Sequence, residues 1–384
     1  DIPKGYQISQ YQFPIVSGGS LLGVQITRVH LEEDTARSIH DAHKGLSLVD
    51  YNRAGVPLME LVTEPVIRSA KEAGAFAREL QLLLRYLGAS EANMEKGEMR
   101  VEANISVSKD PSKFGTKVEV KNLNSFRAVE RAIDYEIARH IDLLESGGTI
   151  VQETRGWTEE TGKTFSQRKK ESSHDYRYFP DPDLPKLWLQ SIAQFAGIEK
   201  TLPELPWERR ARLVKEFSLK PEAAEIFVSD TVLGVFFERV SECLGGNPRE
   251  IELAANYVTS DLMGLMAGDS ATLTLRPEEF AELIRMVFTN ELSSRGAKDL
   301  LKIMCSEGGM PKILAEAHGL LQKSDKGELE AIVKKVIENN PMVVADYRAG
   351  KTALLQFLIG QGMKETKGSA NPGVLKEIFV SLLG

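Results

Sequence analysis

The sequence predicts an α+β protein whose first part is a sheet covered by helices and whose second part is helical. Runs that alternate apolar and polar residues dominate roughly the first 65 positions, as half-buried strands do. Helical periods then alternate with further strand-like runs up to about residue 150. From Trp207 onward helical periods predominate. This order of elements is typical of an α+β domain followed by an all-α region.

The first predicted strands are bounded by glycines and prolines. Gly18-Gly19 marks a turn before a strand over Leu21–Leu31, and another strand runs between Pro57 and Pro65. A polar loop from Thr35 to Gly45 is expected between them, followed by a short run over Leu46–Arg53. These segments predict a β-rich, loop-rich start to the first domain.

Two predicted helices frame two charged strands. The first begins at Ser69, with Glu72 at capping-box spacing, and ends at Gly88. Strands are expected over Met99–Val107 and Thr116–Lys121, where charged and apolar residues alternate. A second helix, about Ser125 to Glu145, ends at Gly147-Gly148. We therefore expect an antiparallel sheet with helices packed on one face.

Composition shifts divide the chain into three expected domains. Residues 149–190 are polar and strand-like, and the proline-rich stretch Asp175–Asp183 near their end, with Pro203 and Pro206 beyond it, marks the first boundary. Helical patterns follow, with Pro277 well placed for a first turn. The last stretch contains three further helices. The expected domains are 1–205, 206–326 and 327–384.

Composition excludes several classes of protein. The chain has 384 residues, 42% hydrophobic and 27% charged, and its apolar runs are too short to span a bilayer. Cys243 and Cys305 are too few for a disulfide framework or a metal knuckle, which favours a reducing compartment, the cytoplasm or an organelle matrix. The net charge of −7 argues against a wholly basic nucleic-acid binder, although a local basic surface is compatible with it.

The run Thr27–Asp34 carries an imidazole and three carboxylates at the end of a strand. Side chains alternate along a strand, so Arg28, His30 and Glu32 should share one face and Glu33 the other. Crowded carboxylates repel each other unless a cation lies between them, and oxygen-rich sites suit Mg²⁺ or Mn²⁺. The alternative is a solvated strand end.

Further charged side chains follow on the later strands. Carboxylates and basic or amide groups recur there, and together they could chelate metal ions and clamp a polyphosphate: Glu102, Glu119, Arg100, Asn104, Lys117 and Lys121. The alternative is a set of ordinary exposed strand faces. Neither a P-loop nor a Rossmann glycine fingerprint is present, so these two nucleotide sites are not supported.

Several long motifs resemble one known family. They stand in family order: Tyr6–Gln10, Arg28–Asp34, Leu48–Glu60, Lys121–Phe126, Asp175–Pro180 and Lys367–Pro372. In these motifs the chain is similar to the B subunit of the tRNA-dependent aspartyl/glutamyl amidotransferase, the GatB/GatE family. The resemblance extends from one end of the chain to the other.

The resemblance implies a fold and an activity. The fold would be a glutamine-synthetase-like cradle, then a helical domain, then a small tail related to YqeY proteins that recognises tRNA. The activity would be that of an ATP- and Mg²⁺-dependent carbon–nitrogen ligase with glutamine as amide donor. Members phosphorylate the side-chain carboxylate of Glu on tRNA(Gln) or Asp on tRNA(Asn). Ammonia from the glutaminase A subunit then displaces the phosphate, in a heterotrimer with a C subunit.

The resemblance also assigns roles to individual residues. It implies that metal ions are held by His30, Glu32, Glu33, Glu102 and Glu119. Glu33 and Glu119, with Lys121, would carry the catalytic roles. Charge and placement add Arg100, Lys117 and Asn104 as groups that bind the nucleotide phosphates.

The start of the chain departs from the family pattern. Asp1 is not an initiator Met, and the family's first strand, with its Gly-Leu-Glu-Val-His motif, is not present. We therefore expect an N-terminal piece to be missing and the metal site to be only partly contained in this chain. The alternative function is a non-catalytic tRNA-binding or assembly module.

Overall fold

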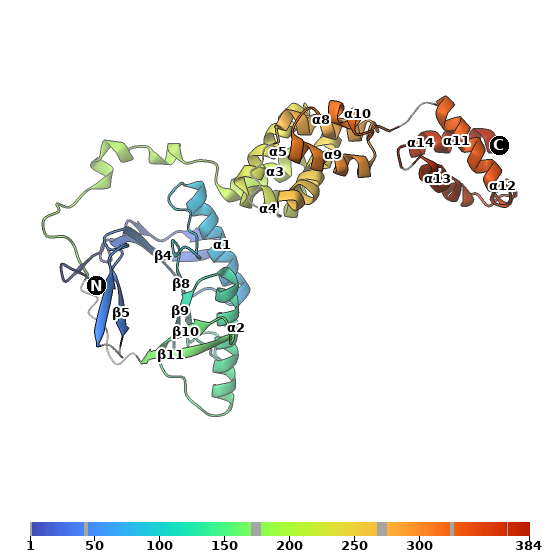
Figure 1. The fold of residues 1–384 in the computed structure, drawn as a ribbon. Helices are drawn as coiled ribbons and strands as arrows, with labels where there is room; N and C mark the ends of the chain where they lie inside the picture. The colour runs from blue at the N-terminus through green and yellow to red at the C-terminus, as the bar shows by residue number, and fades with distance from the viewer. Residues whose placement is uncertain (1, 42–44, 170–177, 267–274, 323–325, 367) are drawn as a thin grey trace. The chain divides into compact units, whose positions relative to one another are not determined.

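The computed structural model describes residues 2–41, 45–169, 178–266, 275–322, 326–366 and 368–384. Two compact units, Asp1–Leu205 and Pro206–Gly384, make up the chain. Residues 175–177 and Lys367, which belong to two of the family motifs, lie outside the described residues. The first unit combines strands and helices, and the second is built of helices (Figure 1). The predicted α+β class followed by a helical region is therefore confirmed.

The strands all lie in the first unit, and their bounds within the described residues are as follows. They are β1 Gln7–Ile8, β2 Val16–Ser17, β3 Ser20–Leu21, β4 Val24–Glu33, β5 Arg37–Asp41, β6 Leu46–Asp50, β7 Pro57–Thr63, β8 Val101–Ile105, β9 Val118–Leu123, β10 Glu153–Thr158, β11 Lys163–Lys169 and β12 Tyr178–Phe179.

The long strand β4 is the centre of one sheet. It pairs antiparallel with β2, β3 and β7, and in its register with β7 His30 lies opposite Glu60. The predicted strand between Pro57 and Pro65 is thus present. The strand predicted over Leu21–Leu31 is present only from Val24, because a tight turn at Leu22-Gly23 makes Ser20–Leu21 a separate strand that pairs with the start of β4. The predicted polar loop Thr35–Gly45 is wrong in part, because β5 forms an antiparallel hairpin with β6. β5 is short and lacks an apolar alternation, so it gives no strand signal.

A second sheet has the strand order β11-β10-β9-β8. The pairs β8–β9 and β10–β11 are antiparallel, but β9 and β10 are parallel. The expectation of a wholly antiparallel sheet is therefore wrong. The reason is the helix between β9 and β10, which carries the chain back so that both strands run in the same direction.

Helix α2 (Phe126–Glu145) packs on one face of the second sheet, and α1 (Ala70–Tyr86) packs against α2 (Figure 1). The Oγ of Ser69 accepts a hydrogen bond from the Glu72 amide at 3.2 Å, so the predicted cap is present. Ser125 caps α2 in the same way, through the Ala128 amide at 3.0 Å. Capping side chains satisfy amides that would otherwise lack partners at a helix start.

Apolar side chains from the helices and strands form the cores of the first unit. One core joins α1, α2 and the second sheet, through Ala70, Met94, Ile105, Val120, Leu123, Ala128, Val129, Ala132, Ile133 and Trp157. Another packs Phe76 of α1 against Leu21 and Val24 of the first sheet. Helix α1 therefore contributes side chains to both cores and connects the two sheets.

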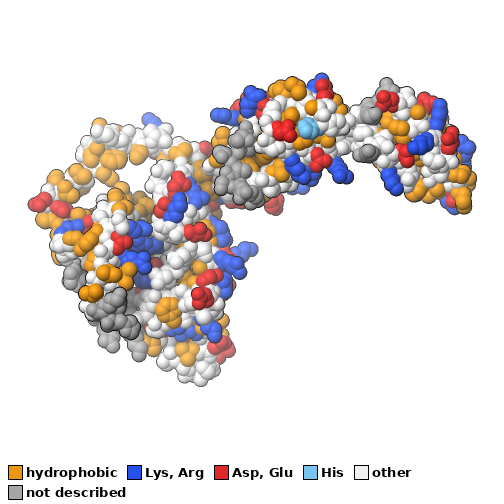
Figure 2. Space-filling view, in the orientation of Figure 1, with side chains coloured by type: hydrophobic (Ala, Val, Ile, Leu, Met, Phe, Trp, Pro, Cys, Tyr) orange, Lys and Arg blue, Asp and Glu red, His pale blue; other side chains and the backbone are white. Residues whose placement is uncertain are grey.

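An exposed segment ends the first unit. After β12 the chain forms short 3₁₀ turns at Leu189–Ser191, Ala193–Phe195 and Ile198–Thr201. Apolar side chains along it, including Leu187 and Trp188, face solvent (Figure 2). The segment contributes little to the cores of the unit.

The second unit consists of helices with the following bounds. They are α3 Pro206–Phe217, α4 Pro221–Ser229, α5 Thr231–Cys243, α6 Pro248–Asn256, a π-helical segment Tyr257–Leu262, α7 Met263–Met266, α8 Pro277–Phe288, α9 Ser294–Glu307, α10 Pro311–Ala317, α11 Lys326–Asn339, α12 Pro341–Arg348, α13 Leu354–Glu365 and α14 Pro372–Leu383. Among the helices of the described ranges, none is long and apolar enough to cross a membrane.

The last four helices share a core of their own. Its buried members are Leu329, Val333, Val336, Val344, Leu355, Leu358, Ile359, Ala370, Leu375, Ile378, Phe379 and Leu383. The three-domain division at residue 326 and the cradle-like architecture stay predictions.

Candidate active site

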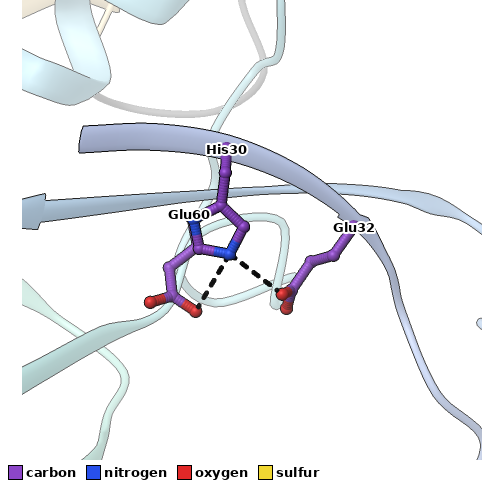
Figure 3. A group of neighbouring side chains, drawn as sticks. All are labelled: His30, Glu32 and Glu60. Carbon is purple, nitrogen blue, oxygen red and sulfur yellow. Dashed lines mark hydrogen bonds and ion pairs between the residues drawn. The ribbon is translucent and has the colours of Figure 1, made fainter. Parts of the chain in front are cut away.

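Three potential metal ligands converge on the first sheet. His30 and Glu32 project from β4, and Glu60 projects from β7 (Figure 3). The Nε2 atom of His30 lies 3.2 Å from Oε2 of Glu32 and 4.0 Å from Oε2 of Glu60. One nitrogen and two carboxylate oxygens therefore lie within 4.8 Å of one another. Among the described residues this is the one such group of His, Cys, Asp or Glu side chains.

The local fold explains this convergence. Alternation along β4 places His30 and Glu32 on one face, as the sequence predicts, and the antiparallel register places Glu60 beside His30. The His30 ring is fully buried, and the Tyr11 ring lies nearly perpendicular to it, with 5.9 Å between the ring centroids. Its Nδ1 atom is buried and has no hydrogen-bond partner in the part of the chain that the structure describes.

The electrostatics of the group favour a bound cation. Burial raises the pKa of the Glu32 carboxyl, and the nearby charge of Glu60 raises it further, whereas the hydrogen bond with His30 acts in the opposite direction. A divalent cation between the two carboxylates would offset both effects. An imidazole nitrogen with carboxylate oxygens is a donor set that accepts Mn²⁺, and the oxygens also suit Mg²⁺. The residues present therefore fit a divalent metal.

Glu33 lies apart from this group. Its carboxylate forms an ion pair with Lys4 and accepts a hydrogen bond from the Ile8 amide at 3.1 Å. Alternation along β4 explains the separation, since neighbouring side chains point to opposite faces. Of the predicted metal ligands, the structure brings together His30 and Glu32, and a metal role for Glu33 stays a prediction.

A second charged cluster lies on β8 and β9. The Nζ atom of Lys121 is 3.0 Å from the Glu102 carboxylate and 3.7 Å from that of Glu119. Asn104 lies opposite Glu119 in the antiparallel register. Thr154 donates a hydrogen bond to Glu119 at 2.9 Å. Four of the predicted site residues are therefore neighbours here: Glu102, Asn104, Glu119 and Lys121.

The two remaining predicted residues differ in their surroundings. Arg100 donates a hydrogen bond to Asp34 at 2.9 Å. Lys117 is exposed immediately before β9, and no hydrogen bond or ion pair joins it to another described residue. Their assignment to nucleotide phosphates stays a prediction.

Sequence reasoning missed Glu60 as a member of the site. The available signal was a carboxylate within an otherwise apolar strand, Leu58-Met59-Glu60-Leu61-Val62. Arg28, which was expected on the His30 face, lies near the group, with Nη2 3.7 Å from Oε1 of Glu60. Its guanidinium also stacks over the Tyr11 ring at 4.5 Å.

Comparisons with known proteins identify the family of this chain. A family model described as the GatB/GatE catalytic domain matches residues 1–193, and one described as the GatB domain matches residues 236–383. The chain is 44% identical over 395 residues to the B subunit of the aspartyl/glutamyl-tRNA(Asn/Gln) amidotransferase from Persephonella marina, covering 100% of this chain and 82% of that relative.

Two further relatives carry the same name. The Alkalilimnicola ehrlichii protein is 44% identical over 392 residues, which cover 99% of this chain and 81% of the relative. The Coxiella burnetii protein is 44% identical over 393 residues, with 99% and 82% covered. The chain therefore belongs to the family of B subunits of the aspartyl/glutamyl-tRNA(Asn/Gln) amidotransferase.

Proposed function

We propose that this chain activates the side-chain carboxylate of Glu attached to tRNA(Gln), or of Asp attached to tRNA(Asn), for amidation. The observation that carries the proposal is the convergence of His30, Glu32 and Glu60 at one buried point on adjacent strands. Family membership supports it, because the relatives are named as B subunits of an amidotransferase that acts on tRNA. The cofactors would be ATP and Mg²⁺.

Chemistry explains why a nucleotide is needed. A carboxylate is a poor acyl donor because its leaving group would be an oxide. A carboxylate oxygen of the substrate attacks the terminal phosphorus of ATP, the bond to ADP breaks, and an acyl phosphate forms. Ammonia then adds to the carbonyl carbon, and inorganic phosphate leaves. Such phosphoryl transfers are catalysed mainly by positioning and by neutralising charge.

The charged residues of the first unit would position the reactants and neutralise the charge of the phosphates. His30, Glu32 and Glu60 would hold the divalent cation, which when bound neutralises phosphate oxygens. Lys121, Arg100, Lys117 and Asn104 would orient the phosphates or the acyl phosphate. Glu33, Glu102 and Glu119 would supply further carboxylates. Glu33 would first have to leave Lys4, its present ion-pair partner.

The rest of the chain would provide partners and substrate recognition. The first unit would adopt a glutamine-synthetase-like cradle, and residues 206–326 a helical domain. Residues 327–384, whose four helices share a core, would bind the tRNA. The A subunit would supply ammonia, and the C subunit would complete the heterotrimer.

An assay of the assembled enzyme tests the proposal. The chain is combined with its A and C subunits, ATP, Mg²⁺ and Glu-tRNA(Gln), and phosphate release and Gln-tRNA formation are followed. Glu60→Gln and Glu119→Gln should lower both rates roughly 100-fold or more, whereas glutaminase activity should persist. Glu64→Gln is the matched control, since Glu64 is exposed and bonded to Thr27.

Two results would contradict the proposal. One is unchanged phosphate release in both the Glu60 and Glu119 variants. The other is a wild-type assembly that binds tRNA without releasing phosphate, which would favour the non-catalytic tRNA-binding module.

A further inference from the structure

Two arginines share one carboxylate oxygen at the end of β4. Arg53 donates from Nε to Oδ2 of Asp34 at 2.8 Å, and Arg100 donates from Nη2 to the same oxygen at 2.9 Å. The other oxygen, Oδ1, accepts from the Thr35 amide at 3.0 Å. Asp34 itself is only 6% exposed. Asp34 is therefore a buried carboxylate that holds two guanidinium groups from separate loops.

The charges of this trio do not balance. One carboxylate neutralises one guanidinium, so the trio keeps an excess positive charge. The side chains of Arg53 and Arg100 are 42% and 57% exposed, so both guanidinium groups remain accessible to a ligand. Arg53 is fixed further by a hydrogen bond from Nη1 to the Gly97 carbonyl at 2.7 Å. Two guanidiniums held in place suit the oxygens of a phosphate group.

Asp34, which holds the arginine pair, directly follows β4, the strand that carries two of the metal ligands. The Asp34 amide donates to the Val56 carbonyl at 2.8 Å, and the Gly55 amide donates to the Asp34 carbonyl at 2.9 Å, which continues the β4–β7 ladder. Asp34 follows Glu32 by two positions and comes directly after Glu33, the last residue of β4. Two residues of a strand span about 7 Å.

We propose that Arg53 and Arg100, held by Asp34, form an anion-binding site for the phosphate chain of the nucleotide. The inference rests on the proposed function and adds Arg53 as a phosphate-binding residue and Asp34 as a positioning residue. The phosphate chain would be held by the two guanidiniums at one end and by a cation bound to His30, Glu32 and Glu60 at the other. In the view of Figure 2, Lys and Arg side chains gather on the face of the first unit that is turned to the viewer.

The test measures binding of inorganic pyrophosphate and of ATP with Mg²⁺ by calorimetry, on the chain assembled with its partner subunits. Arg53→Gln and Arg100→Gln should each weaken pyrophosphate binding about tenfold, because each removes a charge-assisted hydrogen bond. Arg53→Lys should retain only part of the affinity for pyrophosphate, since Lys keeps the positive charge but lacks the planar guanidinium that donates two parallel hydrogen bonds. Arg295→Gln is the matched control, on a side chain that is 93% exposed.

Separate readouts distinguish this inference from the proposed function. In the absence of pyrophosphate, the wild type and Arg53→Gln should bind Mn²⁺ with the same affinity. Glu60→Gln should bind Mn²⁺ more weakly, because Glu60 belongs to the proposed metal site with His30 and Glu32. If Arg53→Gln failed to fold, Arg100→Gln would still test pyrophosphate binding, because the Arg100 side chain is largely exposed and its replacement should leave the fold intact.

Wild-type affinity for pyrophosphate and ATP in the Arg53 and Arg100 variants would overturn the proposal. So would variants that bind both probes normally but lose affinity for uncharged tRNA, because the anion would then be an RNA backbone phosphate.

Discussion

Thr154 donates a hydrogen bond from Oγ1 to Oε2 of Glu119 at 2.9 Å, across the parallel pair of β9 and β10. The two residues are direct partners in the strand register. Thr154 is only 8% exposed, so its hydroxyl is shielded from water and directed at the carboxylate. The parallel pairing that the sequence did not reveal is therefore what orients Glu119 in the second charged cluster.

The first prediction concerns this hydroxyl. Thr154→Val keeps the branched shape but removes the donor, and we expect about a tenfold lower turnover in ATP-dependent amidation if Glu119 acts as proposed. Thr154→Ser retains the donor and should stay close to the wild type. A Val variant with wild-type turnover, or a Ser variant as slow as the Val variant, would refute the positioning role.

A buried ion network ties α2 to the second sheet. Glu136 is fully buried and lies 2.7 Å from Nη2 of Arg139, 3.2 Å from Nε2 of His140 and 3.2 Å from Nε of Arg155. The Thr164 hydroxyl also donates to it. Burial alone would raise the pKa of Glu136, but the adjacent His140 imidazole and the hydrogen bonds from Arg139 and Thr164 outweigh it and lower the pKa to about 2.

The second prediction follows from that pKa. The ordinary value is 4.5, so the folded state favours the ionised carboxylate, and the resulting stability is present above about pH 4.5 and is lost as the pH falls towards 2. At pH 7 it amounts to on the order of 3 kcal/mol. Glu136→Gln should therefore reduce the protection of α2 amides from hydrogen exchange at pH 7.

The pH dependence provides the check on this effect. After correction for intrinsic exchange rates, the difference between wild type and Glu136→Gln should shrink by about half or more at pH 3. A difference of equal size at the two pH values would mean that the charge of Glu136 does not contribute in this way.

The third prediction concerns the core of the last four helices. Phe379 in α14 is fully buried there, and Phe379→Ala should cost about 3–5 kcal/mol and unfold these helices. Phe357→Ala in α13 is the matched control, because Phe357 is 45% exposed. Limited proteolysis and tRNA binding are measured for both. We expect protease sensitivity and weaker tRNA binding in the Phe379 variant alone.

The opposite outcome would be a Phe379→Ala protein whose last four helices are digested by protease but whose affinity for tRNA equals that of the wild type. That result would show that these helices do not bind tRNA. Glutaminase activity of the assembly serves as the internal control for the rest of the complex.

Local signals in the sequence predicted much of this fold. Ser69 caps α1 as its spacing to Glu72 predicts, because capping depends on residues within one turn, and α2 begins after Ser125, about where the helix was predicted to start. The shared face of His30 and Glu32 also follows from local alternation and is confirmed by their contact.

Features that depend on pairing between distant segments could not be predicted in this way. Glu60 reaches His30 only because β7 pairs with β4 in one register, while β5 and β6 lie between them in the chain. Register is set by tertiary packing and not by the strand's own residues. The same limit applies to Arg53 and Arg100, which meet at Asp34 from separate loops.

The most direct test of the central claim is a Mn²⁺ titration of the assembled protein, followed by electron paramagnetic resonance. We expect the wild type and the control Glu64→Gln to bind the ion equally. Glu60→Gln should bind it roughly tenfold or more weakly, because it removes one of three ligands from the group with His30 and Glu32. Equal Mn²⁺ affinity in all three proteins would contradict the assignment of this group as a metal centre.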